Sequence, residues 1–214
     1  MAARTPPLAQ PEPALRGRDP PASTGAARAA LSRYFVALRP GQRARAALGA
    51  FARDLAGRFG GRAVAPADIH LTLAFIGQAP RSAEHAIAGA VAALPRPGTL
   101  ALARVGSFDG RLLWLAPPEP PAQWLAQLAG ELRVQLERVG VAFDRKRFRP
   151  HVTLVRGARG ADRDALAQIQ VPAAAGGFGR ARAWLVESTL LPSGSRYRWI
   201  ETPAGTRGEG VNAA

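Results

Sequence analysis

The stretch "RPHVTLVR", residues 149–156, repeats the pattern of an earlier stretch, "IHLTLAF", residues 69–75. In each, a histidine is followed two positions later by a threonine, with an aliphatic residue between them and a leucine after. Short apolar runs with β-branched residues predict β-strands. Successive side chains of a strand point to opposite faces, so each histidine should project with its own threonine while the aliphatic neighbours turn into the core.

The repetition predicts a chemical role for His70, Thr72, His151 and Thr153. A lone strand histidine is usually a hydrogen-bonded, half-buried side chain, and His85, off the apolar stripe of its expected helix, is read as a surface residue. Two facing imidazoles are different, because an unperturbed pKa near ~6.5 lets one act as a base and the other as an acid. Threonine hydroxyls are suited to hold the oxygens of a phosphate between them.

Metal binding is the competing use of paired histidines. Two candidate ligands without a carboxylate at a completing spacing do not make a metal set, so we expect no metal and no cofactor. The chain has no cysteine, which excludes disulfides, thiolate zinc sites, iron–sulfur clusters and cysteine nucleophiles.

The charge balance favours an anionic partner. The formal net charge is +14, from 29 basic and 15 acidic residues, although an alanine- and arginine-rich composition weakens that argument. Four of the five positions 145–149 are basic, and Arg156 follows the second motif. Alternation would place Arg149 on the face of His151, where it and Arg156 could clamp a phosphate backbone. A solvated charged loop is the alternative.

The chain divides into three parts. Residues 1–32 contain six prolines and no aromatic residue, which predicts a disordered extension. Residues 33–204 should form the folded domain, and 205–214 a disordered tail. Expected strands span 33–38, 69–77, 99–108, 111–117, 150–156, 182–191 and 196–201, and expected helices span 42–59, 82–94, 122–139 and 162–169. This interleaving predicts an α+β fold with largely antiparallel sheets. Without an apolar run of ~20 residues, we expect a soluble cytoplasmic protein.

The two motifs, behind the opening "RYFVAL" strand and beside the "VGSFDGRLLWL" hairpin, resemble the signatures of the 2H phosphoesterase superfamily. Within it, they are similar to the RNA 2',3'-cyclic phosphodiesterases, also called the 2'-5' RNA ligase family. The resemblance covers roughly residues 33–202. It implies a bilobal fold of two pseudo-symmetric lobes, each with a small antiparallel sheet and flanking helices, around a central cleft.

The resemblance also implies metal-independent hydrolysis of RNA 2',3'-cyclic phosphate ends to 2'-phosphomonoesters, with reversible 2'-5' ligation as an associated reaction. By motif, His70 would be the proton donor and His151 the proton acceptor, though the near-symmetry of the motifs leaves these roles interchangeable. Thr72 and Thr153 would orient the phosphate, with Arg149 and Arg156 as further substrate contacts. Open alternatives are a sister activity on a small cyclic nucleotide or an ADP-ribose cyclic phosphate, and a non-catalytic RNA-binding module. We expect a monomer whose partner is RNA or a small cyclic nucleotide, without membrane association.

Overall fold

The computed structural model describes residues 30–192 and 194–201. Most of the predicted N-terminal extension and all of the predicted tail at 205–214 lie outside the described residues. The predicted boundary at residue 33 differs slightly from the structure, because the first strand already begins at Leu31.

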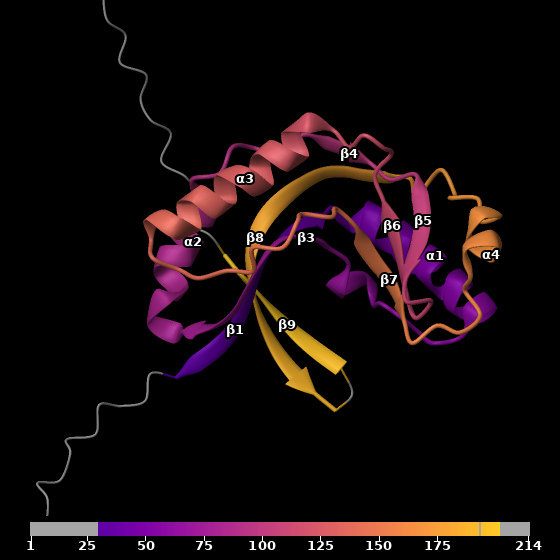
Figure 1. Cartoon of the computed structure of the whole chain (residues 1–214), viewed down its shortest axis with the longest axis horizontal. Coiled ribbons are helices and arrows are strands. Elements are labelled where there is room, and N and C mark those ends of the chain that lie inside the picture. The colour runs from indigo at the N-terminus through magenta and orange to yellow at the C-terminus, as the bar shows by residue number, and fades with distance from the viewer. Residues whose placement is uncertain (1–29, 193, 202–214) are drawn as a thin grey trace, which may run out of the picture.

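Strands and helices are interleaved along the chain as the sequence predicts (Figure 1). The expected strand at 99–108 is divided into two strands, and a short strand at 62–63 was not predicted. The expected helix at 82–94 starts as a 3-10 turn, Arg81–Ala83, and becomes α-helical at Glu84. The elements are β1 (Leu31–Pro40), α1 (Gln42–Phe59), β2 (Arg62–Ala63), the 3-10 turn η1 (Pro66–Asp68), β3 (Leu71–Pro80), α2 (Glu84–Ala92), β4 (Thr99–Ala101), β5 (Arg104–Phe108), β6 (Leu112–Ala116), α3 (Gln123–Arg138), β7 (Val152–Arg156), α4 (Arg163–Ala167), β8 (Gly177–Leu191) and β9 (Gly194–Ile200).

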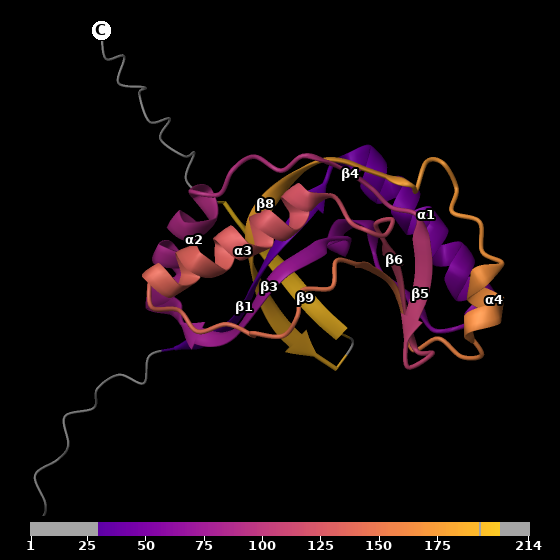
Figure 2. The same ribbon diagram turned by 45° about the horizontal axis from the view of Figure 1, so that its top comes forward.

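The strands form two antiparallel half-sheets that meet in the middle of the molecule. The strand order is β4-β8-β1-β3-β7-β6-β5, with β9 added to β8 and β2 added to β7. Between β3 and β7, both wholly described, the register holds one pair, Leu71 with Val152. Helices α2 and α3 pack on the β8 and β3 side, and α1 and α4 on the β7 and β5 side, as both views show (Figures 1 and 2). The predicted α+β fold of two lobes is confirmed.

The main core lies between the half-sheets and these helices. The helical spacing of Leu48, Phe51, Leu55 and Phe59 on α1 predicts an inward stripe, and all four residues are buried. The periodicity of α3 predicts an inward stripe of Trp124, Leu128, Leu132, Leu136 and Val139. The three leucines are buried and Trp124 packs partly buried against the same core, but Val139 is 39% exposed because it lies at the C-cap, beyond the last helical turn.

Strand β1 is buried on both faces, which explains its unbroken apolar run "YFVAL". Val36 and Leu38 belong to the main core. Phe35 and Ala37, on the opposite face, form a second cluster with Val186 of β8, against which Trp184, Tyr197 and Trp199 pack.

Within the described part of the chain, no helix has the length and apolar character that a membrane span requires.

Candidate active site

The two histidines occupy equivalent positions in the fold. His70 immediately precedes β3 and His151 immediately precedes β7. Because Leu71 pairs antiparallel with Val152, His70 lies across from Thr153, and Thr72 lies across from His151. Leu71 and Val152 are fully buried, so the histidines and threonines project from the other face, as the sequence alternation predicts.

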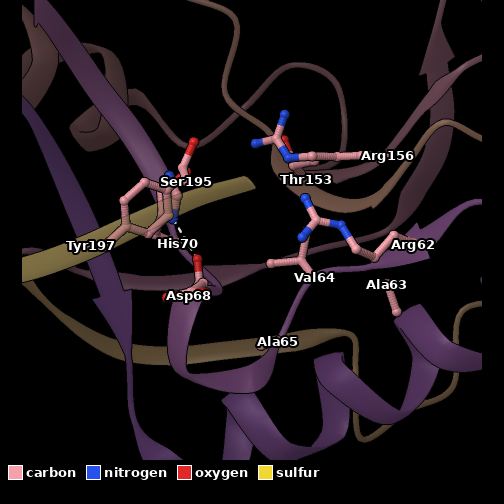
Figure 3. Close-up of a pocket in the computed structure, with 10 residues that line it drawn as sticks. All are labelled: Arg62, Ala63, Val64, Ala65, Asp68, His70, Thr153, Arg156, Ser195 and Tyr197. Atoms are coloured by element: carbon pink, nitrogen blue, oxygen red, sulfur yellow. Dashed lines mark hydrogen bonds between the residues drawn. The ribbon is translucent and has the colours of Figure 1, made fainter. Parts of the chain in front are cut away.

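The cavities beside this junction show how the two motifs interlock. One cavity of about 250 Å³ is lined by His70 of the first motif and Thr153 of the second (Figure 3). A neighbouring cavity of about 280 Å³ is lined by Thr72 of the first motif and His151 of the second. Each histidine therefore shares its cavity with the threonine of the other motif.

A backbone carbonyl fixes the orientation of each imidazole. His70 Nδ1 lies 2.6 Å from the carbonyl oxygen of Asp68, and His151 Nδ1 lies 2.7 Å from that of Arg149. A carbonyl oxygen can only accept a hydrogen bond, so Nδ1 must carry the hydrogen in both rings. The atom left to exchange a proton with a substrate is Nε2 in each case.

His70 sits among aromatic rings. Its ring centroid lies 5.0 Å from that of Phe35, 5.4 Å from that of Tyr197 and 6.0 Å from that of Trp199. Burial among these groups lowers the pKa of His70 to about 4. The carbonyl of Asp68 opposes this shift, and the charges of Arg156 and His151 add to it.

His151 has a similar but more open environment. The ring of Phe108 meets it edge-on with centroids 5.0 Å apart. Burial lowers the pKa of His151 from its ordinary value of 6.5, the carbonyl of Arg149 opposes the shift, and the charge of Arg156 adds to it. Both imidazoles are therefore mainly neutral at pH 7 in the free protein.

Two arginines bring positive charge to the cavity of His70. Arg62 of β2 and Arg156 of β7 are direct cross-strand neighbours, and both guanidinium groups extend toward the cavity (Figure 3). Like charges directly across a strand pair are unfavourable. The carboxylate of Asp68, in the same cavity, offsets part of this cost, and a bound anion would offset more of it. Arg156 was predicted as a site residue, and Arg62 was not.

Arg149 lies beside His151, as predicted, because both residues line the same two cavities. It lies before β7, outside the regular strand alternation, and its side chain is exposed at the rim of the His151 cavity. Its backbone carbonyl holds His151. Nearby basic residues are partly neutralised, since Arg145 pairs with Glu137 and Lys146 with Asp144. Part of the basic run is thus a solvated charged loop.

Ser195 and Tyr197, which line the His70 cavity from β9, were not predicted as site residues. The one local signal was the alternation in "RYRW", which places Tyr197 and Trp199 on one strand face. Among residues 30–192 and 194–201, no group of three histidine, aspartate or glutamate side chains has a metal-binding arrangement.

Known proteins share both the sequence pattern and the fold. A family model described as the 2'-5' RNA ligase superfamily matches residues 38–188. The RNA 2',3'-cyclic phosphodiesterase of Escherichia coli (strain K12) is 40% identical over 100 residues, 46% of this chain and 56% of that protein. The protein of the same name from Geobacillus stearothermophilus is 32% identical over 137 residues, 60% of this chain and 43% of that protein. The chain thus spans about half the length of these curated relatives.

Solved structures match over a larger share of their length. A crystal structure of Escherichia coli LigT complexed with 3'-AMP has a TM-score of 0.65 at 28% identity, covering 80% of this chain and 96% of that one. A crystal structure of a Thermus thermophilus protein, TT0787, has a TM-score of 0.58 at 27% identity, covering 79% of this chain and 95% of that one.

Proposed function

This chain belongs to the 2'-5' RNA ligase superfamily, and we propose that it hydrolyses RNA 2',3'-cyclic phosphate ends to 2'-phosphomonoesters by acid–base catalysis with two histidines. The observation that carries the proposal is the interlocked register at Leu71 and Val152, which brings two imidazoles and two threonine hydroxyls of one chain to one face. The names of the two curated relatives support the same reaction.

The proposed reaction is a displacement at phosphorus. Nε2 of neutral His151 takes a proton from water as the water oxygen bonds to phosphorus, and the bond from phosphorus to O3' breaks. His70, protonated at Nε2, gives that proton to the departing O3'. The 2'-phosphate remains on the ribose, and a proton exchange with solvent resets the two rings. In ligation, an RNA 5'-hydroxyl would take the place of water.

The remaining side chains would bind the phosphate. The hydroxyls of Thr72 and Thr153 can donate hydrogen bonds to its non-bridging oxygens. Arg62 and Arg156 lie in the cavity of His70, where they would stabilise negative charge that develops on the phosphate and the departing oxygen. The cavity of His151 also carries basic side chains, those of Arg133, Lys146, Arg147 and Arg149, so the assignment of His70 as the acid rests on the motif resemblance and not on charge.

Substrate must change the protonation of His70 for this assignment to work. Its pKa of about 4 leaves it neutral near pH 7 when the site holds no anion. A phosphodiester anion beside both imidazoles favours their charged forms and raises their pKa values. We therefore propose that substrate binding is coupled to proton uptake at His70.

The proposal is for a cytoplasmic enzyme that acts as a monomer, since one chain supplies both halves of the site.

The test of the proposed reaction uses an oligoribonucleotide with a 2',3'-cyclic phosphate end, incubated with the protein in the presence of a chelator. The expected product is the 2'-phosphomonoester, separated from the 3' isomer by chromatography.

Two further substrates distinguish the alternatives. A 2',3'-cyclic mononucleotide and an ADP-ribose cyclic phosphate are assayed under the same conditions. Preference for either over the oligonucleotide would indicate a small-molecule enzyme of the same superfamily. Binding of RNA with no turnover of any of the three would indicate a binding module and overturn the proposal.

A further inference from the structure

A second surface lies next to the histidines on the same side of the sheet. It is formed by Arg39 of β1, Arg182 and Trp184 of β8 and Trp199 of β9, and we call it the tryptophan–arginine face. Both tryptophans are partly buried against the second apolar cluster, and neither is part of the main core. The strands that carry these residues lie side by side, β9 along β8 and β8 along β1 (Figure 2).

The groups on this face are stacked in an alternating arrangement. The guanidinium carbon of Arg39 lies 4.3 Å from the ring centroid of Trp199 and 5.9 Å from that of Trp184. The guanidinium carbon of Arg182 lies 4.9 Å from the Trp184 centroid, and the two indoles meet edge-on with centroids 6.3 Å apart. The face therefore combines aromatic surface with fixed positive charge.

The positive charges of this face are placed close together. Arg39 and Arg182 are direct cross-strand partners, which sets like charges opposite each other. Nε of Arg39 is buried without a hydrogen-bond partner among the described residues. Burial and the nearby charge of Arg45 lower the pKa of Arg39, and the charge of Asp68 opposes this shift. A ligand with negative charge along its length would relieve this repulsion.

Single-stranded RNA is the ligand that fits both properties. Nucleobases stack on tryptophan and on guanidinium planes whatever their sequence, and the phosphates between them pair with arginine. An acidic peptide would satisfy the arginines but would not extend the stack of indole rings and guanidinium groups. The face is also continuous with the proposed site, because Trp199 contacts His70 with ring centroids 6.0 Å apart.

The direction of the RNA follows from the proposed chemistry, on which this inference rests. In an in-line displacement, the attacking water and the departing O3' lie on opposite sides of phosphorus. If His70 protonates O3', the terminal ribose lies on the His70 side, and the preceding nucleotides leave the site on that side. We propose that the nucleotides 5' to the cyclic phosphate stack on the tryptophan–arginine face, so that the protein favours an RNA chain over a single nucleotide.

The test compares two substrates on matched variants. Values of kcat/KM are measured for a cyclic-phosphate oligoribonucleotide and for a 2',3'-cyclic mononucleotide. Trp184→Ala should lower the oligonucleotide value by about 5- to 150-fold, the range for loss of one stacked base, and leave the mononucleotide value within about twofold. Trp184→Phe, which keeps an aromatic ring, should recover most of the loss. Trp184 is chosen over Trp199 because Trp199 lies beside His70, and its loss would also alter the environment of that imidazole.

Charge is tested separately. Arg182→Gln should weaken oligonucleotide binding and reduce its salt dependence by about one ion contact, whereas Arg53→Gln, an equal charge change on the exposed face of α1, should do neither.

Equal losses on both substrates for Trp184→Ala, with an unchanged melting temperature, would overturn the inference. So would a wild-type kcat/KM that does not depend on chain length.

A binding measurement separates this inference from the proposed function. Quenching of tryptophan fluorescence by an oligoribonucleotide ending in a 2'-phosphate reports stacking without turnover. Quenching that Trp184→Phe weakens, in a protein that turns over no cyclic phosphate, would support the stacking face and overturn the proposed reaction. Absence of quenching in an enzyme that turns over the cyclic phosphate would support the proposed reaction and overturn the stacking face.

Discussion

Leu71 and Val152 form the register pair at which the two half-sheets meet, and both side chains are fully buried in the main core. The same pair sets which histidine faces which threonine on the opposite side. This pair therefore links the packing of the main core to the geometry of the site.

Truncation at this junction should destabilise the whole domain. Leu71→Ala is expected to lower the free energy of unfolding by about 2–5 kcal/mol, because it removes buried methyl groups and leaves a cavity. Urea denaturation followed by circular dichroism measures the change. Leu190→Ala, at a side chain 64% exposed, is the matched control and should stay within about 0.5 kcal/mol of wild type. A similar effect of both substitutions would contradict the assigned role of the junction.

His70 and His151 should contribute to turnover far more than His85. His70→Ala and His151→Ala are each expected to lower kcat by about 10² to 10⁴, the usual contribution of a positioned acid or base. The double variant should lose little more than the worse single one, because the two groups act in one step. His85→Ala, an exposed substitution on α2, should keep wild-type activity. Near-normal turnover by either single variant would contradict the two-histidine mechanism.

The threonines should act through their hydroxyl groups. Thr72→Val and Thr153→Val keep the side-chain shape but remove the donor, so kcat should fall by about 10² to 10³ for each if the hydroxyl stabilises developing charge. Thr→Ser at the same positions keeps the donor and should retain most of the activity. Steady-state kinetics on the cyclic-phosphate oligonucleotide distinguishes these cases, and equal activity of the valine and serine variants would show that the hydroxyls do not bind the phosphate.

The sequence was sufficient to place the four motif side chains on one face, because strand alternation is local. His70 and Thr72 alternate with buried Leu71 and Leu73 as expected. Local periodicity does not say which distant strand lies across from a given one, so it could not show that His70 faces Thr153. The register between β3 and β7 supplies that information, and it depends on the packing of the whole domain.

The residues that were missed have the same explanation. Arg62 belongs to a strand of two residues, which is too short to produce any period, and it reaches the site only because β2 pairs with β7. Tyr197 reaches His70 from the far end of the chain.

Activity should depend on pH in a way that the environments of the two histidines determine. The reaction needs one imidazole protonated and the other neutral. In the free protein the pKa of His70 is about 4, and that of His151 is lowered from 6.5. Below the lower pKa both rings are charged and no base is present, while above the higher pKa both are neutral and no acid is present. The value of kcat/KM should therefore form a bell whose maximum lies below pH 6.5, falling about tenfold per unit on the alkaline side.

Arg156→Gln tests the electrostatic origin of this profile. The positive charge of Arg156 lowers the pKa of both histidines, so its removal should move both limbs of the bell to higher pH. The variant should also bind the cyclic phosphate more weakly, because one cation of the cavity is lost. Arg53→Gln provides the control for net charge, since it removes an equal charge from exposed α1 and should leave the profile in place. An alkaline limb that stays fixed in Arg156→Gln would mean that the titrating acid is not one of the two histidines beside this arginine.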